Sequence, residues 1–580
     1  MNIAANFGGW NIRELNFTAD LTTALTFSST GAYIDFMGVS GGASNAVVIN
    51  DSSFTQTITT EFLHRTDVNT GMLWQANNGD IVMSANILQS NANTAETITI
   101  DNGVGRSVTF SGDNTYNTAT SILAGTLIAA SDTALGTTVS NTTVPSGATL
   151  ELQNDITIAA GETLTNNGTL FNAQDDNTYA GVIAGSGGVD VSGGELTLTN
   201  TNTFTGAINL TGGALTISSQ ENLGGFGSNA DLTLNGGTFR IDGGTVDNDD
   251  NNRTMVLGAG GGIIDTVSGS DTLIWDNNIT GSGDLTKTGA GTFRFDDPTT
   301  FTGDLNANAG TVEFSGGDNR LNNQVDVTIA SGATLDVRDR SDDFGSLAGA
   351  GTLTLGSSNI LDDSMDLNVA GGTFTLASGI TETIDQLNVS AGNLNVDGIL
   401  TMNGGTLSGG DGAGSDGTLV LTAGNTLNIT NDFDFGGTLK LTAGTALALS
   451  GGSTFGLENL NITGNSVIDF GSADANTLNL GSLTIGDGVT ITVNNWISFQ
   501  DLWTTGSFSG GTGAVTIDGR DANTAQITFT GFSPADTIWL TSDFGSNEIT
   551  VPEPSSYGAI LMGFGLIAWT LRRPRRNGRV

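Results

Sequence analysis

A glycine followed by a small or polar residue and then an aliphatic residue or phenylalanine recurs along this chain at short intervals. Within two long runs the marker returns after 19 to 26 residues. Its glycines are Gly125, Gly147, Gly168, Gly194, Gly213 and Gly237, and then Gly291, Gly310, Gly332, Gly351, Gly372 and Gly392. A period of about 20 residues accommodates three strands of about 4–5 residues and three turns, whereas helical repeats need about 33–34 residues. The period therefore predicts a solenoid of stacked β-strands.

Apolar and polar residues alternate within the short segments between these glycines. From Leu478 to Val493, leucine, isoleucine and valine occupy alternate positions of each short run. Such alternation indicates strands with one buried face, bounded by Gly, Asn and Asp turns. A hydrophobic content of 37% argues against a disordered chain. We expect no helix of useful length before Ser555.

A longer motif is superimposed on three of these repeats. A threonine precedes an aromatic residue at Tyr116, Phe204 and Phe301, and a marker glycine follows nine residues later in each case. The pattern resembles the autotransporter-associated β-strand repeat of bacterial passenger proteins. The match is clearest near residues 103–135, 182–223 and 279–316. The resemblance implies a right-handed parallel β-helix and implies no activity.

The repeats suggest a division of the chain into three parts. We expect residues 1–495 to form the β-helical region, residues 496–550 to cap it, and residues 551–580 to act separately. The open end of a solenoid leaves backbone groups unpaired and needs a cap. The proposed cap region is rich in aromatic residues, namely Trp496, Phe499, Trp503, Phe508, Phe529, Phe532, Trp539 and Phe544.

The final segment begins with a short proline-containing motif. Val551, Pro552, Glu553 and Pro554 form a rigid, extended tetrapeptide, because each proline restricts φ and removes a backbone donor. This composition differs from that of the repeats.

An uncharged apolar run and a basic cluster come after the motif. The run covers residues 557–571, and the basic cluster consists of Arg572, Arg573, Arg575 and Arg576. At about 1.5 Å per residue the run spans about 22 Å as a helix, which crosses a membrane marginally with the help of snorkelling arginines. Arginines after the run should stay in the cytoplasm, which places the acidic body outside. We therefore expect a single C-terminal transmembrane helix.

Motif, apolar run and basic end together resemble the PEP-CTERM sorting signal of Gram-negative bacteria. The resemblance implies recognition by an exosortase, a membrane processing enzyme, with processing near Pro552–Pro554. It also implies an association with exopolysaccharide and biofilm matrix. Such proteins carry an N-terminal signal peptide, but the first twenty residues contain neither a basic region nor an apolar core of the required length. We expect the coding sequence to start upstream.

The charge balance excludes a partnership with nucleic acid. The chain has 17 basic and 59 acidic residues, a net charge of −42, and five of the bases lie in the last nine positions. Binding to phosphate needs Lys and Arg. Cysteine is absent, so thiol chemistry is excluded, and the single histidine, His64, cannot build a histidine cluster. We expect His64 to be a solvated turn residue.

Paired acids are candidates for glycoside chemistry, but their positions suggest turns. The pairs are Asp175–Asp176, Asp249–Asp250, Asp296–Asp297, Asp342–Asp343 and Asp362–Asp363. Two carboxylates do serve glycosidases. We favour turn residues and assign no catalytic residue, with a β-helical polysaccharide lyase or hydrolase as the alternative.

Two acid-rich segments could ligate Ca²⁺ through carboxylate and carbonyl oxygens. They begin at Val246 and at Gly409, and the second lacks an Asp at the position of Gly414 that the repeat-in-toxin nonapeptide requires. Solvated turns are the favoured interpretation, and we assign no metal or cofactor site.

The sequence thus predicts an all-β, right-handed parallel β-helix with a C-terminal cap and one transmembrane helix. Its expected function is that of an exported, non-catalytic surface or matrix protein. We expect it to be adhesive or structural, with an extracellular polysaccharide as a partner.

Overall fold

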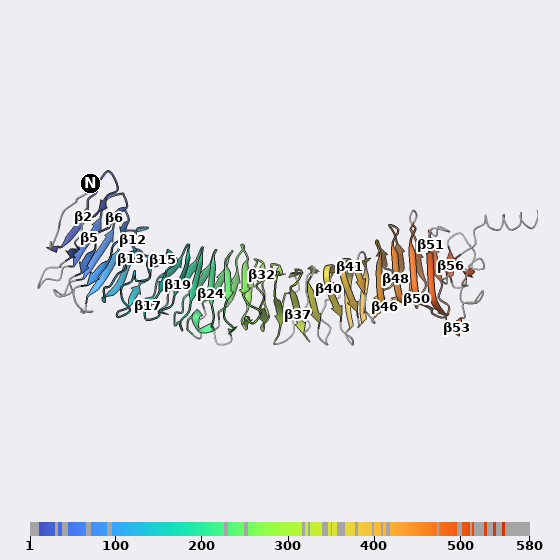
Figure 1. Ribbon diagram of the computed structural model, residues 1–580. Coiled ribbons are helices and arrows are strands. Elements are labelled where there is room, and N and C mark those ends of the chain that lie inside the picture. Colours follow the sequence, from blue (N-terminus) through green and yellow to red (C-terminus); the bar gives the residue numbers. More distant parts are fainter. Residues whose placement is uncertain are drawn as a thin grey trace, which may run out of the picture. The chain divides into compact units, whose positions relative to one another are not determined.

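The computed structural model describes most of the repeat region and several short segments C-terminal to it (Figure 1). The described residues are 11–28, 33–36, 45–64, 71–89, 96–225, 230–248, 253–315, 320–322, 325–338, 346–349, 351–355, 366–376, 381–396, 399–407, 410–412, 418–471, 475–495, 502–510, 513–515, 527–529, 538–540 and 548–550. The predicted transmembrane helix and the sorting motif lie outside them.

The chain divides into two compact units, Met1–Val325 and Asp326–Val580. The boundary falls inside the region that the repeats predict to be continuous. Within each unit, short strands pair in parallel with strands about one repeat away in the sequence. The prediction of an all-β parallel solenoid is confirmed. Within the described ranges the helical structure is one 3₁₀ turn, Gln220–Leu223.

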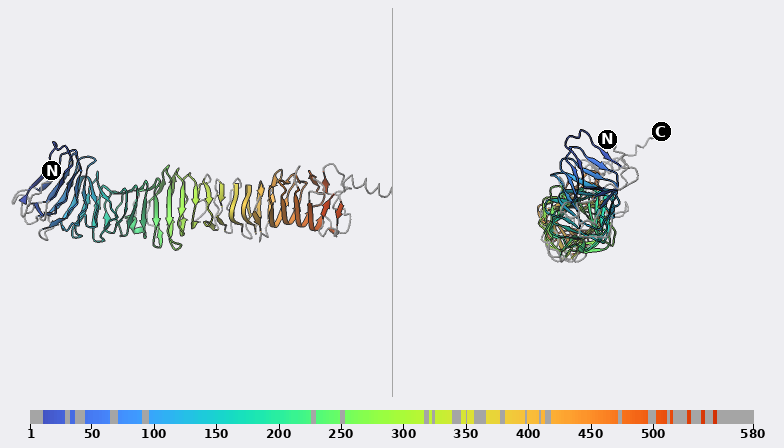
Figure 2. Two further views of the ribbon diagram at one scale, coloured as in Figure 1. Left: turned by 45° about the horizontal axis from the view of Figure 1, so that its top comes forward. Right: turned by 90° about the vertical axis from the view of Figure 1, so that its left-hand side faces the viewer.

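Three strands make one turn, or rung, in the first unit. β5 (Ala46–Asn50), β6 (Gln56–Ile58) and β7 (Phe62–His64) pair with β8 (Met72–Ala76), β9 (Ile81–Met83) and β10 (Ile87–Gln89), respectively. Figure 2 shows successive strands following one another along the coil. A rung therefore adds its strands to three separate sheets.

We call three of the sheets of the first unit face 1, face 2 and face 3, while β7 and β10 belong to a further, four-stranded sheet. Face 1 contains β5, β8, β11 (Thr97–Asp101), the first half of β13 (Ala119–Ala129), β14 (Thr142–Val144), β17 (Thr163–Asn166) and β20 (Val182–Ala184). Face 2 contains β6, β9, β12 (Ser107–Phe110), the second half of β13, β15 (Ala148–Leu152), β18 (Thr169–Asn172), β21 (Gly188–Val191), β23 (Ile208–Leu210), β25 (Leu232–Leu234), β28 (Met255–Leu257) and β31 (Ile279–Gly281). Face 3 contains β16 (Thr157–Ile158), β19 (Asp176–Tyr179), β22 (Glu195–Leu198), β24 (Ala214–Ile217), β26 (Thr238–Ile241), β29 (Gly262–Thr266), β32 (Leu285–Thr288) and β34 (Leu305–Ala307).

Aliphatic side chains stack in columns inside the coil. On face 2 one column runs through successive rungs, and all of its members are 0% exposed. They are Val108, Leu127, Leu150, Leu170, Val189, Ile208, Leu232, Met255 and Ile279. Because each burial contributes about 1.5–3 kcal/mol, the column holds neighbouring rungs together. The alternation in the sequence produces this column, because the residues on either side of each member point outward.

A marker glycine forms the corner between faces 1 and 2. β13 runs from one face to the other and bends at Gly125, whose φ is 71°. A Cβ there would lie 2.5 Å from the Cβ of Asn102. The corner therefore requires both the left-handed backbone and the missing side chain of glycine.

The longer motif fills a second corner. Tyr116, Phe204 and Phe301 are 0% exposed. Two residues before Phe204, the buried Asn202 accepts from the Ile183 N–H at 2.8 Å and donates to the Asn222 carbonyl at 2.8 Å. Asn114, two residues before Tyr116, makes the same pair of bonds to the rungs on either side. All three copies of the motif thus supply a buried aromatic side chain, and two of them also supply an amide that joins three rungs.

The second unit repeats the arrangement with strands that often continue round a corner. One series is β44 (Thr418–Leu421), β46 (Phe433–Leu441), β48 (Thr454–Ile462), β50 (Thr477–Ile485) and β52 (Leu502–Gly510). A second is β45 (Thr426–Ile429), β47 (Ala446–Leu449), β49 (Ser466–Asp469), β51 (Ile491–Asn494) and β54 (Ile527–Phe529).

Strand direction changes in the region predicted to cap the solenoid. β52 pairs antiparallel with β53 (Gly513–Val515) and β56 (Glu548–Thr550), and β56 pairs antiparallel with β55 (Ile538–Leu540). Trp503 on β52 is 0% exposed, and its ring centroid lies 6.3 Å from that of Phe470. Antiparallel pairing therefore joins the parallel pairing here, since β54 still pairs in parallel with β51.

Candidate functional site

The predicted position of His64 is wrong. His64 is on β7, not in a turn, and it is 0% exposed. It stacks in register between Phe36 and Gln89, and its Nε2 lies 3.9 Å from the Oε2 of the buried Glu96. Inward and outward side chains alternate along Phe62–His64, so the imidazole faces the core on the same side as the ring of Phe62. A ligand at the surface does not reach this imidazole.

The described acid pairs lie at turns or strand ends. Asp175 has a φ of 65° and accepts from the Asn154 N–H at 2.8 Å, so it shapes a corner. Asp176 begins β19, and its own N–H donates to Asp155 at 2.9 Å. Asp296–Asp297 follow β33 (Thr292–Phe295). The pairs at 249–250, 342–343 and 362–363 lie outside the described residues.

Most of the two candidate Ca²⁺ segments also lies outside the described residues. Within the described ranges, no group of three or more His, Asp or Glu side chains is arranged to hold a metal ion.

A polar cluster interrupts the core of the first unit. Glu162 is 3% exposed, and the Thr142 hydroxyl donates to its Oε1 at 2.7 Å. Burial raises the pKa of Glu162 to about 7. The hydroxyl of Tyr116 lies 3.0 Å from that of Thr120, and burial raises the pKa of Tyr116 and of Tyr179. The cluster is enclosed, so it bears on stability more directly than on ligand binding.

Two buried cations bind turn carbonyls. Lys287 is 0% exposed, and its Nζ donates to the carbonyls of Gly289 at 3.0 Å and Ala309 at 3.3 Å. Burial lowers its pKa to about 8. Arg253 is also 0% exposed, lies over the Phe204 ring at 5.5 Å, and donates to three carbonyls, while burial lowers its pKa to about 10. Both cations act as internal braces.

A charged ladder crosses face 3. The Nη1 of Arg240 lies 2.6 Å from Glu195 Oε2, and its Nε lies 2.9 Å from Asp265 Oδ2. The three side chains are between 17% and 32% exposed, so the ladder contributes about 1 kcal/mol or less per pair. Its single cation is held by two carboxylates, so the ladder leaves no free cation to attract an anionic ligand.

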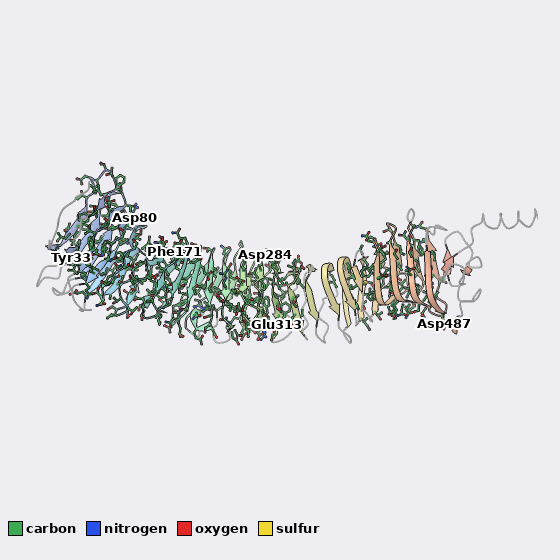
Figure 3. The ribbon with its side chains drawn as sticks, in the orientation of Figure 1. Tyr33, Asp80, Phe171, Asp284, Glu313 and Asp487 are labelled. Atoms are coloured by element: carbon green, nitrogen blue, oxygen red, sulfur yellow. The ribbon has the colours of Figure 1, made fainter. Side chains whose placement is uncertain are left out.

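A glycine-lined hollow of about 300 Å³ opens at the corner between faces 2 and 3. It is lined by Gly236, Ala259, Gly260, Gly261, Gly262, Ile263, Ser282, Gly283, Asp284 and Thr286. Asp284, labelled in Figure 3, accepts from the Asp304 N–H at 2.9 Å. A Cβ at Gly283 would lie 1.8 Å from the Gly258 carbonyl oxygen, so close stacking of the rungs accounts for this glycine.

Face 2 presents an outward aromatic residue that sequence reasoning missed. On β18, Leu170 and Asn172 are buried, whereas Thr169 and Phe171 are partly exposed. Phe171 lies in register between Glu151 and Asp190 of the adjacent rungs. The sequence could have indicated this residue, because Phe171 occupies an outward position of the alternating pattern, where a polar residue is expected.

Comparison with known proteins identifies a motif in the C-terminal segment of the chain. A model of the PEP-CTERM protein-sorting motif matches residues 550–576. The chain carries a PEP-CTERM sorting motif and autotransporter-type repeats. The repeats are similar to the adhesin BmaC autotransporter of Brucella suis biovar 1 (strain 1330), with 27% identity over 419 residues. That match covers 67% of this chain and 11% of the relative, and no solved structure matches the chain.

The PEP-CTERM match includes every residue singled out in the tail. Val551 to Pro554 lie at its start, and the four arginines Arg572, Arg573, Arg575 and Arg576 lie at its end. All of them are outside the described residues. Within the described parts, no helix combines the length and apolar character needed to cross a membrane.

Proposed function

We propose that this is an exported, adhesin-like surface protein of a Gram-negative bacterium, delivered to the cell envelope through its PEP-CTERM motif. The observation that carries the proposal is the match of this motif to residues 550–576, C-terminal to a long series of strands that pair in parallel. Similarity to an adhesin autotransporter supports the surface role.

The finer features of the proposal rest on the sequence. An exosortase recognises Val551–Pro554, and residues 557–571 hold the chain in the membrane at least transiently, with the arginine cluster on the cytoplasmic side. The solenoid is right-handed, and residues 496–550 cap it. The change to antiparallel pairing at β52 supports a cap.

The proposed role is adhesive or structural, in exopolysaccharide or biofilm matrix, and it includes no catalysis. Burial of His64 and the pairing of Arg240 with two carboxylates support a surface without an accessible imidazole or a free cation at these positions. Incubation of the purified chain with acidic and neutral polysaccharides should therefore release no product. Reproducible product release would replace this role with that of a polysaccharide lyase or hydrolase.

Surface delivery is tested in cells that contain an exosortase. A variant with Pro552, Glu553 and Pro554 all changed to alanine should remain unprocessed, so its mass should exceed that of the processed wild type. As a matched control, Pro145→Ala changes a proline of the repeat region and should leave processing intact. Equal processing of the wild type and the triple variant would contradict the proposal.

A further inference from the structure

Phe171 differs from the other aromatic residues of the solenoid. Between residues 101 and 495, every other aromatic side chain whose exposure the structure describes is buried. Phe171 instead lies on the outer side of β18, in the middle of face 2, and is labelled in Figure 3. An outward aromatic ring contributes little to the core and offers a flat apolar surface to a ligand.

Two carboxylates flank this ring. Glu151 precedes Phe171 in the register and Asp190 follows it, so with a strand spacing of about 4.8 Å their backbones lie about 10 Å apart. Gln153 donates to Glu151 Oε1 at 2.6 Å, and Asn209 donates to Asp190 Oδ1 at 2.7 Å. Each amide orients one carboxylate and binds only one of its oxygens.

The carboxylates beside Phe171 lack the cation that balances acids elsewhere in the unit. Arg240 binds Glu195 and Asp265 on face 3, and Arg294 binds Glu313 at 2.5 Å. Among the described residues, no Lys, Arg or His forms an ion pair with Glu151 or Asp190. The patch around Phe171 is therefore a partly exposed aromatic ring between two carboxylates that no described cation pairs with, which favours a cationic ligand.

Neighbouring positions keep the patch open and polar. Gly188 pairs with Thr169 and has no side chain beside Asp190. Asn209 continues the outward column in the next rung, and Thr233 comes after it. A linear polymer that runs along the column from Glu151 to Thr233 meets a polar or aromatic group at each rung.

We infer that the column Glu151–Phe171–Asp190–Asn209 binds a polysaccharide that contains amino sugars with free amines. This inference deepens the proposed matrix role and rests on it. A sugar ring places its CH face on Phe171, and an ammonium group on the same or the next unit meets Glu151 or Asp190. The chain's net charge of −42 adds long-range attraction for the cationic polymer and repels uronic acid polymers. One sugar unit spans about the distance between rungs, which suits a linear polysaccharide better than a compact ligand.

Binding to the purified full chain tests the inference. The probes are a glucosamine oligosaccharide, its N-acetylated counterpart, a galacturonate oligosaccharide and an oligolysine of matched charge. We expect the glucosamine oligosaccharide to bind most tightly. Phe171→Thr, and separately the pair Glu151→Gln with Asp190→Asn, should each weaken it roughly tenfold or more, as expected for loss of contacts to a charged group.

A charge-matched variant separates a site from general attraction. Glu14→Gln with Asp113→Asn removes the same charge from two exposed carboxylates of the first unit and should leave affinity nearly unchanged. Equal losses in both double variants would overturn the inference, and so would wild-type affinity in Phe171→Thr with a native circular dichroism spectrum. Tighter oligolysine binding with the same dependence on the variants would replace the polysaccharide with a basic protein. Surface delivery of the same variants, followed by protease accessibility on cells, tests the proposed function separately.

Discussion

Replacing Glu162 by glutamine should stabilise the first unit at alkaline pH and leave it unchanged in acid. Burial raises the pKa of this carboxyl from 4.5 to about 7. No described Lys, Arg or His forms an ion pair with it. The ionised form therefore lies in an enclosure that favours the neutral acid.

The difference in pKa sets the sign and the size of the effect. Between pH 4.5 and 7 the folded chain holds a proton that the unfolded chain has lost, so stability falls as pH rises through this window. Above it both states are ionised, and the folded chain bears a penalty of about 3 kcal/mol, at about 1.4 kcal/mol for each pKa unit. Glu162→Gln keeps the acceptor for the Thr142 hydroxyl and removes the charge.

Hydrogen exchange is the appropriate assay, because a solenoid opens locally and not as one unit. Amides of β14 and β17, which lie beside Glu162, should exchange up to roughly a hundredfold more slowly in Glu162→Gln than in the wild type at pH 8. At pH 4 the two should agree. Glu14→Gln, at an exposed carboxylate of the same unit, should show no such difference. Faster exchange in Glu162→Gln at pH 8 would refute the reasoning, since it would mean that the charge is stabilised.

Three further substitutions test the internal contacts. Asn202→Ala should destabilise its corner by about 2–4 kcal/mol in urea unfolding, because the Ile183 N–H and the Asn222 carbonyl both lose a buried partner. An unchanged free energy of unfolding would contradict the two-bond account. Burial lowers the pKa of Lys287 in the folded chain to about 8, whereas the ordinary value is 10.5. Between these two pH values the unfolded chain holds a proton that the folded chain has lost, so the stability of the wild type should rise with pH. Thermal melts of Lys287→Met should not show this rise. Leu170→Ala should cost about 2–5 kcal/mol in the same melts, because it empties a fully buried position in the face 2 column, and a neutral result would place the residue outside the core.

The parallel coil could be predicted because its signals are local and periodic. Marker glycines such as Gly125 and Gly310 recur at rung corners and have positive φ, so spacing alone indicated the rung. Alternation then assigned the inward side of most strands, as it did for Leu478 and Leu480, which are buried on β50.

Features that depend on neighbouring rungs were not accessible from the sequence. The amide of Asn202 binds one rung on each side, and its partners are known only once the rungs are in register. His64 and Lys287 are polar residues at inward positions, where alternation and polarity give opposite predictions. Their burial depends on nearby partners, Glu96 for one and turn carbonyls for the other. Phe171 presents the reverse conflict, an apolar residue at an outward position.

Cysteine cross-linking tests the stacking of rungs most directly, since the chain contains no cysteine of its own. Thr178 and Thr197 face outward and pair in register on adjacent strands of face 3. Their Cα atoms should lie about 5 Å apart, within the range of a disulfide, whereas Thr178 and Thr216 are separated by two rungs, or about 10 Å. Mild oxidation should therefore bridge Thr178→Cys/Thr197→Cys in the native protein and leave Thr178→Cys/Thr216→Cys reduced. Efficient bridging of the second pair, or none of the first, would contradict the stacked parallel coil.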